Sequence, residues 1–133
     1  MDQRFTPAVS IALVNGDRVL LVRRGRPPSM GLYAFPGGRV EQDEALEDAV
    51  RRELREETTL EAGPVRLVTV LDLAGEPPSP AFRLHVFTAS YVGGEAIAGD
   101  DAAEARWFTV ADMDQLPVIA SVRAVAEELI GAA

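Results

Sequence analysis

One helical segment restricts the fold of this chain more than any other feature, because its acidic residues continue an apolar stripe. At about 100° per residue, four positions between residues 43 and 58 fall on one line: Leu46, Val50, Glu53 and Glu57. Glu56 lies beside Glu57, so three carboxylates gather near the C-terminal half of one helical face. Like charges on a core-facing stripe destabilise a fold unless something neutralises them. A divalent cation would do so, whereas a solvated acidic face would place the acids opposite the apolar stripe.

The amino-acid composition excludes several classes of protein. The 133 residues carry a net charge of −8, no cysteine, a single histidine and 47% hydrophobic residues, and all thirteen cations are arginine. This length and apolar content predict one globular domain over residues 1–133. Without cysteine there are no disulfides or thiolate ligands, so a metal here would be a hard cation on oxygen. The charge argues against nucleic-acid binding, no apolar run is long enough to span a membrane, and we expect a cytoplasmic protein.

The apolar runs and the turn residues predict strands on either side of a long helix. Residues 6–14 and 18–24 flank Asn15-Gly16 and predict a β-hairpin. Pro36-Gly37-Gly38 is expected to break regular structure, and Asp43 to cap a helix that runs to about Thr58. We expect two further strands at 64–73 and 82–92, and short strands at 33–35 and 105–108. An acidic loop is expected at 99–104 and a closing helix at 119–130. This order predicts an α/β fold in which helices cover a mixed sheet.

Residues 38 to 60 carry a motif with many fixed positions. They read Gly38, five residues, Glu44, seven residues, and then Arg52-Glu53-Leu54-Arg55-Glu56-Glu57-Thr58-Thr59-Leu60. This pattern closely resembles the Nudix box of the MutT-like Nudix hydrolases. Each fixed position of the box is matched except Thr59, where the family usually has glycine. A left-handed residue follows many helices, and a β-branched residue there is strained by roughly 1–2 kcal/mol; we therefore expect the loop at Thr59 to change shape.

The resemblance implies a Nudix-type α/β/α sandwich and a pyrophosphohydrolase that uses Mg²⁺ or Mn²⁺. Glu53, Glu56 and Glu57 would then face the metal, together with the backbone carbonyl of Gly37. The resemblance further implies that Arg52 orients Glu56, and that Glu44 braces the loop instead of binding metal. Many members form homodimers, so a homodimer is one outcome that the resemblance allows.

The general base is left open between two sources. Glu53 is the candidate inside the box, while Asp100, Asp101 and Glu104 lie in the acidic loop that resembles the family's distal one. Among these loop acids we favour Glu104. An ordinary solvated loop acid is the competing interpretation of each.

The substrate-binding candidates are weaker. Arg23 and Arg24 end a predicted strand and point to opposite faces, so one of them could reach a phosphate. Phe35 and Phe82 could stack a nucleobase, although core packing is the preferred explanation of both. His85 and Trp107 are expected to be ordinary sheet and core residues.

The substrate itself stays open among small nucleotides. ADP-ribose or another nucleoside diphosphate sugar is the first interpretation, toward which Pro77 in the proline-rich loop is a faint indication. The alternative is a nucleoside triphosphate cleaved to the monophosphate and pyrophosphate, as in the nucleotide-sanitising branch. A non-catalytic nucleotide-binding regulator is a lesser alternative, because such modules usually lose the box carboxylates that this chain keeps.

Overall fold

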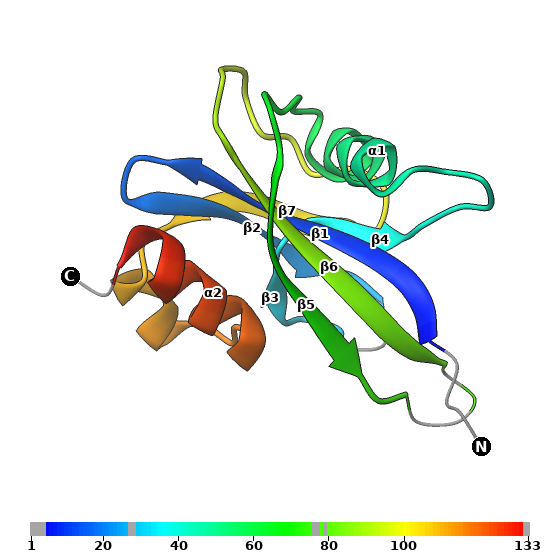
Figure 1. Cartoon of the computed structure of the whole chain (residues 1–133). Coiled ribbons are helices and arrows are strands. Elements are labelled where there is room, and N and C mark those ends of the chain that lie inside the picture. The colour runs from blue at the N-terminus through cyan, green and yellow to red at the C-terminus, as the bar shows by residue number, and fades with distance from the viewer. Residues whose placement is uncertain (1–4, 27–28, 76–77, 79, 132–133) are drawn as a thin grey trace.

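The computed structural model describes residues 5–26, 29–75, 78 and 80–131. In this part of the chain a seven-stranded sheet lies between two helices, one on each face (Figure 1). The main strand order is β3-β2-β1-β6-β5, with β4 paired to β1 and β7 paired to β2. The elements are β1 Phe5–Asn15, β2 Arg18–Arg24, β3 Tyr33–Ala34, β4 Gly37–Arg39, α1 Leu46–Thr58, β5 Arg66–Leu73, β6 Ala81–Ser90, β7 Ala102–Phe108, a 3₁₀ turn at Ala111–Gln115 and α2 Ala120–Ile130. The predicted α/β sandwich with a mixed sheet is confirmed.

Strand β1 organises the sheet. Val14 pairs with Val19 across the Asn15-Gly16 turn, so the predicted antiparallel hairpin is present. On its other side β1 runs parallel to β6 over ten residue pairs, which makes the sheet mixed. The predicted strands near 64–73 and 82–92 form β5 and β6 and pair with each other antiparallel.

The alternation of side chains along β1 divides the core into two layers. Val9, Ile11 and Leu13 are fully buried and pack in the cluster that includes Ala49, Val50 and Leu54 of α1. Ala12 belongs to the opposite cluster, where Val122, Val125 and Ala126 of α2 pack on the sheet. Trp107 packs against the first of these layers, as expected of a core residue. The apolar stripes of both helices therefore bury against the two faces of one sheet.

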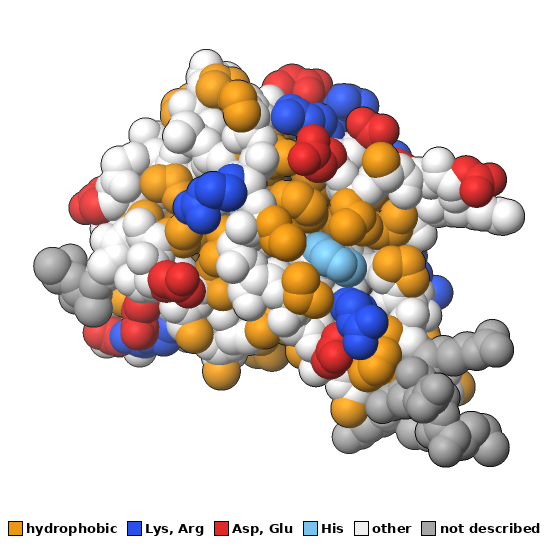
Figure 2. Space-filling view, viewed as in Figure 1, with side chains coloured by type: hydrophobic (Ala, Val, Ile, Leu, Met, Phe, Trp, Pro, Cys, Tyr) orange, Lys and Arg blue, Asp and Glu red, His pale blue; other side chains and the backbone are white. Residues whose placement is uncertain are grey.

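Helix α1 does not cover the whole of its face. Figure 2 shows His85 surrounded by hydrophobic side chains on the open part of the sheet. Val70, the register partner of His85, is 42% exposed, and Leu67 is 47% exposed. None of the described helices is long and apolar enough to cross a membrane.

Three sequence expectations about the segment from Pro36 to Thr59 are wrong. Pro36-Gly37-Gly38 does not end regular structure, because Gly37 and Gly38 lie in β4 and pair with Ser10 and Val9 of β1. Helix α1 begins after Ala45 without a side-chain cap, and Asp43 instead has a left-handed backbone with φ of 62°.

The third concerns the end of α1. Thr59 keeps the left-handed conformation usual for glycine, with φ of 65°, and so the loop does not change shape at this residue. Its backbone N–H donates to the Arg55 carbonyl at 2.9 Å, and its hydroxyl donates to the Glu95 carbonyl at 3.2 Å. The hydroxyl contact offsets part of the strain of a β-branched residue in this conformation.

Candidate active site

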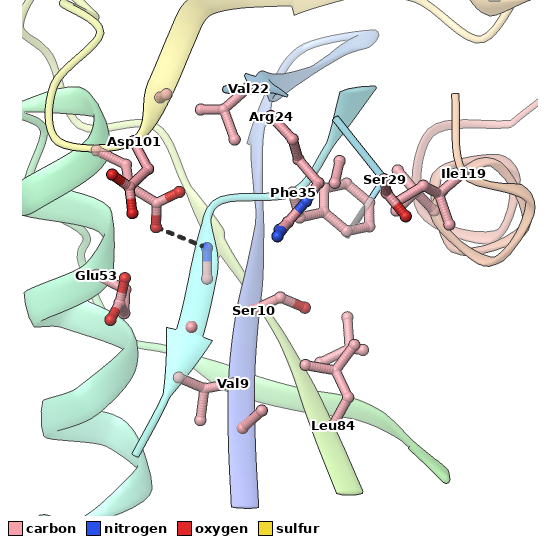
Figure 3. A pocket seen from close by; sticks show the side chains of 18 of the residues that line it. Val9, Ser10, Val22, Arg24, Ser29, Phe35, Glu53, Leu84, Asp101 and Ile119 are labelled. Atoms are coloured by element: carbon pink, nitrogen blue, oxygen red, sulfur yellow. Dashed lines mark hydrogen bonds between the residues drawn. The ribbon is translucent and has the colours of Figure 1, made fainter. Parts of the chain in front are cut away.

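Two glutamates of α1 form the centre of the site. Glu57 is 9% exposed, and its Oε2 accepts a hydrogen bond from the Gly37 N–H at 3.0 Å (Figure 3). The Glu53 carboxylate lies against Gly38, where an added Cβ would come within 2.6 Å of it. Glycine at position 38 therefore lets strand β4 approach the acids closely. The predicted helix spacing and the glycine lead-in act together to bury Glu57 and to leave Glu53 half-buried beside it.

The negative charge of this carboxylate pair is not fully neutralised by its surroundings. Burial, and then hydrogen bonding and charge from Glu53, hold the pKa of Glu57 well above its usual range, although the Gly37 N–H and Arg24 oppose this. Two carboxylates in one buried site cannot both ionise without a compensating charge. Oxygen donors of this kind suit Mg²⁺ or Mn²⁺, so the residues fit the predicted divalent metal.

Arg52 holds the outer side of the pair. Its Nε and Nη2 bind Glu44 at 2.8 and 2.9 Å, and its Nη1 donates to Glu53 at 2.9 Å. The contact to Glu56, at 3.3 Å, is the longest of these. Glu44 also accepts from the Glu41 N–H, as expected of a residue that braces the loop. Arg52 therefore orients Glu53 more than Glu56, because its fork is already occupied by Glu44.

Glu56 does not join the buried pair. Its side chain is 42% exposed and turns toward Arg52. No three acidic or histidine side chains come together closely enough to hold a metal ion in the described residues. The expected cluster of three carboxylates is thus a buried pair with a third acid on its rim.

A cavity of about 680 Å³ connects the acid pair to the opposite face of the sheet. Figure 3 shows Glu53 and Asp101 at one end and Ile119 at the other, with Ser10, Arg24 and Phe35 between them. The second end, which we call the apolar arm, is lined by Phe35, Phe82, Leu84, Val86, Ile119 and Val122. A volume of this size is typical of sites for small organic ligands.

The structure separates the two arginines of β2. Arg24 lines the cavity together with Glu53 and Glu57, and its positive charge opposes the rise in the pKa of Glu57. Arg23 also borders the cavity, but it is held by Glu104 at 3.6 Å and by the Gly31 carbonyl at 3.4 Å. The pairing of β2 with β7 is irregular between these two residues, which changes the direction of the strand there.

Glu104 is not brought to the acid pair. It lies in β7 and not in a loop, and it alternates with Ala105 and Trp107, which pack on the α1 side. Its carboxylate accepts from the Tyr33 hydroxyl at 2.8 Å, and this bond is the main cause that lowers the pKa of Glu104.

The other two acids of this region do line the cavity. Asp100 and Asp101 border it, and the preceding Gly99 N–H donates to the Glu57 carbonyl at 3.0 Å. Asp101 is also paired with Arg26 at 2.9 Å. The acidic segment therefore meets the end of α1 through Gly99, and Asp100 and Asp101 follow it at the border of the cavity.

Phe35 and Phe82 both line the cavity, and Phe35 is only 6% exposed. His85 is a sheet residue, as expected, with Nδ1 3.4 Å from the Ala8 carbonyl. Pro77 lies outside the described residues. Sequence reasoning missed Ser10, whose only signal was a hydroxyl within the apolar run of β1.

Comparison with known proteins identifies the family. The NUDIX domain model matches residues 4–129. An ADP-ribose pyrophosphatase of Methanocaldococcus jannaschii is 38% identical over 116 residues, which cover 86% of this chain and 67% of that protein. An NAD-capped RNA hydrolase NudC of Pseudomonas putida is 35% identical over 122 residues, or 90% of this chain. The match covers 42% of NudC, so this chain spans less than half of its length.

A solved structure gives the same result. The crystal structure of a MutT NUDIX hydrolase from Burkholderia pseudomallei superimposes with a TM-score of 0.85 at 27% identity, covering 96% of this chain and 99% of that one. The family match extends over nearly the whole chain, and the box residues of α1 stand at the end of a ligand-sized cavity. The chain belongs to the Nudix family, whose members hydrolyse phosphoric anhydride bonds.

Proposed function

We propose that this chain is a metal-dependent pyrophosphohydrolase that cleaves ADP-ribose or a similar nucleoside diphosphate sugar. The observation that carries the proposal is a cavity that joins the carboxylate pair to an apolar arm. A diphosphate would lie at the acid pair, and the nucleoside would extend into the arm. Substrates of this kind have a charged diphosphate and a flat, largely apolar base, which correspond to the acid end and the apolar arm of the cavity.

The acid end supplies charge and position. Glu53 and Glu57 would hold the metal, with the Gly37 carbonyl beside them and Glu56 at the rim. Bound Mg²⁺ or Mn²⁺ supplies the positive charge that neutralises the diphosphate and activates water. Arg24 adds a positive side chain on the cavity side of Glu57. Arg52 fixes Glu53 through the 2.9 Å bond and so keeps its carboxylate turned toward Gly38.

We assign the general base to Glu53, with Asp100 or Asp101 as the alternative. Glu53 borders the cavity, whereas Glu104 does not. The base accepts a proton from water as the water oxygen bonds to one phosphorus and the anhydride oxygen leaves with the other phosphate. For ADP-ribose this gives AMP and ribose 5-phosphate.

The names of the relatives support the choice of substrate. ADP-ribose and an NAD cap share an adenosine diphosphate joined to a ribose, and these are the substrates in the names of the two relatives at 38% and 35% identity. The apolar arm offers an adenine ring an apolar lining, with Phe35 and Phe82 on its walls.

A hydrolysis screen tests the proposal. Purified protein with Mg²⁺ or Mn²⁺ is incubated with ADP-ribose, other nucleoside diphosphate sugars, NAD and nucleoside triphosphates, and products are resolved by chromatography. We expect AMP and ribose 5-phosphate from ADP-ribose. Cleavage of triphosphates to monophosphate and pyrophosphate, with ADP-ribose intact, would assign the chain to the nucleotide-sanitising branch instead. Nucleotide binding without any turnover would favour a regulator.

A further inference from the structure

One hydroxyl in the cavity lacks a protein partner. Ser10 lies in the middle of β1 and is 6% exposed, yet its Oγ makes no hydrogen bond within the described residues. Buried polar atoms are nearly always paired, so an exception needs an explanation. Two explanations are a ligand that pairs with the hydroxyl and an accident of packing. A buried hydroxyl on the neighbouring strand allows the two to be compared.

Thr88 provides that comparison on the adjacent strand β6. It is 8% exposed and its Oγ1 donates to the Ala12 carbonyl at 2.8 Å, so its hydroxyl serves the fold. Thr88 does not border the cavity, whereas Ser10 does. The two hydroxyls are similarly buried on neighbouring strands, and the one without a protein partner is the one that faces a ligand-sized space.

The position of Ser10 sets which part of a ligand it meets. Its register partner is Gly37, whose N–H holds Glu57, so Ser10 is one strand away from the acid pair. Figure 3 shows the Ser10 side chain directed away from Glu53, on the same side as Leu84 and Phe35. The hydroxyl therefore lies where the charged end of the cavity gives way to the apolar arm.

We propose that the Ser10 hydroxyl is a substrate-binding contact that hydrogen-bonds the polar edge of a nucleobase seated in the apolar arm. This inference rests on the proposed function, because it assigns the nucleoside to that arm. A ribose phosphate would bury several hydroxyls among Phe35, Leu84 and Val86, where they would stay unpaired. A purine ring buries mostly apolar surface and needs few such bonds, one of which Ser10 supplies.

Binding of AMP tests the inference separately from turnover, because AMP contains no anhydride bond to cleave. Affinities of wild type and Ser10→Ala for AMP and for ribose 5-phosphate are measured by calorimetry with Mg²⁺. We expect Ser10→Ala to weaken AMP binding about 3- to 10-fold and to leave ribose 5-phosphate binding unchanged. The melting temperature of the ligand-free protein should not fall, because the variant removes an unpaired buried group.

Thr88→Val is the matched control. It removes a satisfied hydroxyl outside the cavity, so it should lower the melting temperature and leave AMP affinity unchanged. Equal loss of AMP and ribose 5-phosphate affinity in Ser10→Ala would overturn the assignment to the base. Unchanged AMP affinity, a fall in melting temperature like that of Thr88→Val, or no AMP binding by wild type would overturn the inference as a whole. Turnover of ADP-ribose by the same wild-type preparation shows independently whether the proposed function stands.

Discussion

The two ends of the cavity are built in different ways. The acid end comes from a short stretch of sequence, with Gly37, Gly38, Glu53 and Glu57 on β4 and α1. The apolar arm is assembled from elements far apart in the chain: the residue that follows β3, strand β6, and α2 with the residue that precedes it. Chemistry that depends on fixed spacing within one helix leaves a motif in the sequence, whereas a surface assembled by the whole fold leaves none. The reaction class is therefore easier to infer than the substrate.

The largest expected effect falls on the acid end. Glu53→Gln and Glu57→Gln should each lower kcat for ADP-ribose roughly 10²- to 10⁴-fold, because each removes charge that holds the metal or accepts the proton. Steady-state rates with saturating Mg²⁺ measure this. Glu47→Gln, an exposed residue of the same helix, is the matched control and should be neutral. Glu104→Gln should retain activity within about threefold, and a loss as large as that of Glu53→Gln would contradict our assignment of the base.

The second effect is a pH dependence of stability in metal-free protein. Since the pKa of Glu57 is raised in the fold, the folded state retains a proton that the unfolded state has lost above about pH 4.5. The free energy of unfolding should therefore fall as pH rises from about 5.5 to 8, by at most about 1.4 kcal/mol per pH unit. Glu44, whose pKa is lowered, is ionised throughout this range and adds no slope.

Urea unfolding across this pH range, with and without Mg²⁺, measures that dependence. Mg²⁺ should remove most of the decline, and Glu57→Gln should flatten it without metal. A stability that rises with pH in the metal-free wild type would contradict the electrostatic description of the pair.

The third prediction concerns the support of the acid pair. Arg52→Ala should lower the free energy of unfolding by about 2 kcal/mol, because it leaves Glu44 and Glu53 without their partly buried partner. Arg55→Ala breaks an ion pair of the same 2.8 Å length with Glu61 on an exposed surface, and it should cost much less than Arg52→Ala. Equal losses in chemical denaturation would show that burial of Arg52 does not matter.

The fourth prediction sharpens the description of the apolar arm. Phe82→Ala should raise KM for ADP-ribose about 10-fold and change kcat little, because it removes a wall of the arm and no charged group. Phe5→Ala is the control, since Phe5 is also a partly buried ring contacted by an arginine but does not border the cavity. A fall in kcat with unchanged KM for Phe82→Ala would mean that the substrate does not occupy the arm.

The smallest effect is expected at the end of α1. Thr59→Gly should raise the free energy of unfolding by about 0.5–1 kcal/mol, because relief of left-handed strain exceeds the lost bond to Glu95. Thr59→Ala keeps the strain and loses the hydroxyl, so it should be less stable than wild type. Urea denaturation distinguishes the two, and a destabilised Thr59→Gly would show that the hydroxyl contact dominates.

Much of the fold could be predicted from local patterns. The hairpin at Asn15-Gly16, the helix to Thr58 and the closing helix all follow from turn residues and apolar periodicity, which act over a few residues. Strand β4 could not be predicted in this way. Its glycines disfavour a strand, and they pair with β1 because β4 must pass close to the acid pair.

In the site, too, the residues that follow a local pattern could be predicted, whereas those that depend on the assembled fold could not. The helical wheel places Glu53 and Glu57 together, but it cannot show that Glu56 stays at the rim. Its longer contact with Arg52 depends on Glu44, which occupies the Arg52 fork from the loop before the helix. The place of Glu104 in an acidic segment favours it as a base, but strand alternation puts its side chain on the other face of the sheet. Ser10 had no motif, since only the assembled cavity shows that its hydroxyl is unpaired.

The most direct test of the central claim is the Mg²⁺ dependence of ADP-ribose cleavage by wild type and Glu57→Gln, measured side by side as release of AMP and ribose 5-phosphate. If the buried pair holds the catalytic metal, wild type releases both products in equal amounts only when Mg²⁺ is present, and the variant stays at least a hundredfold slower at saturating Mg²⁺ (roughly the loss expected for a metal-holding charge). Metal-independent cleavage, or a variant as fast as wild type, would contradict the account.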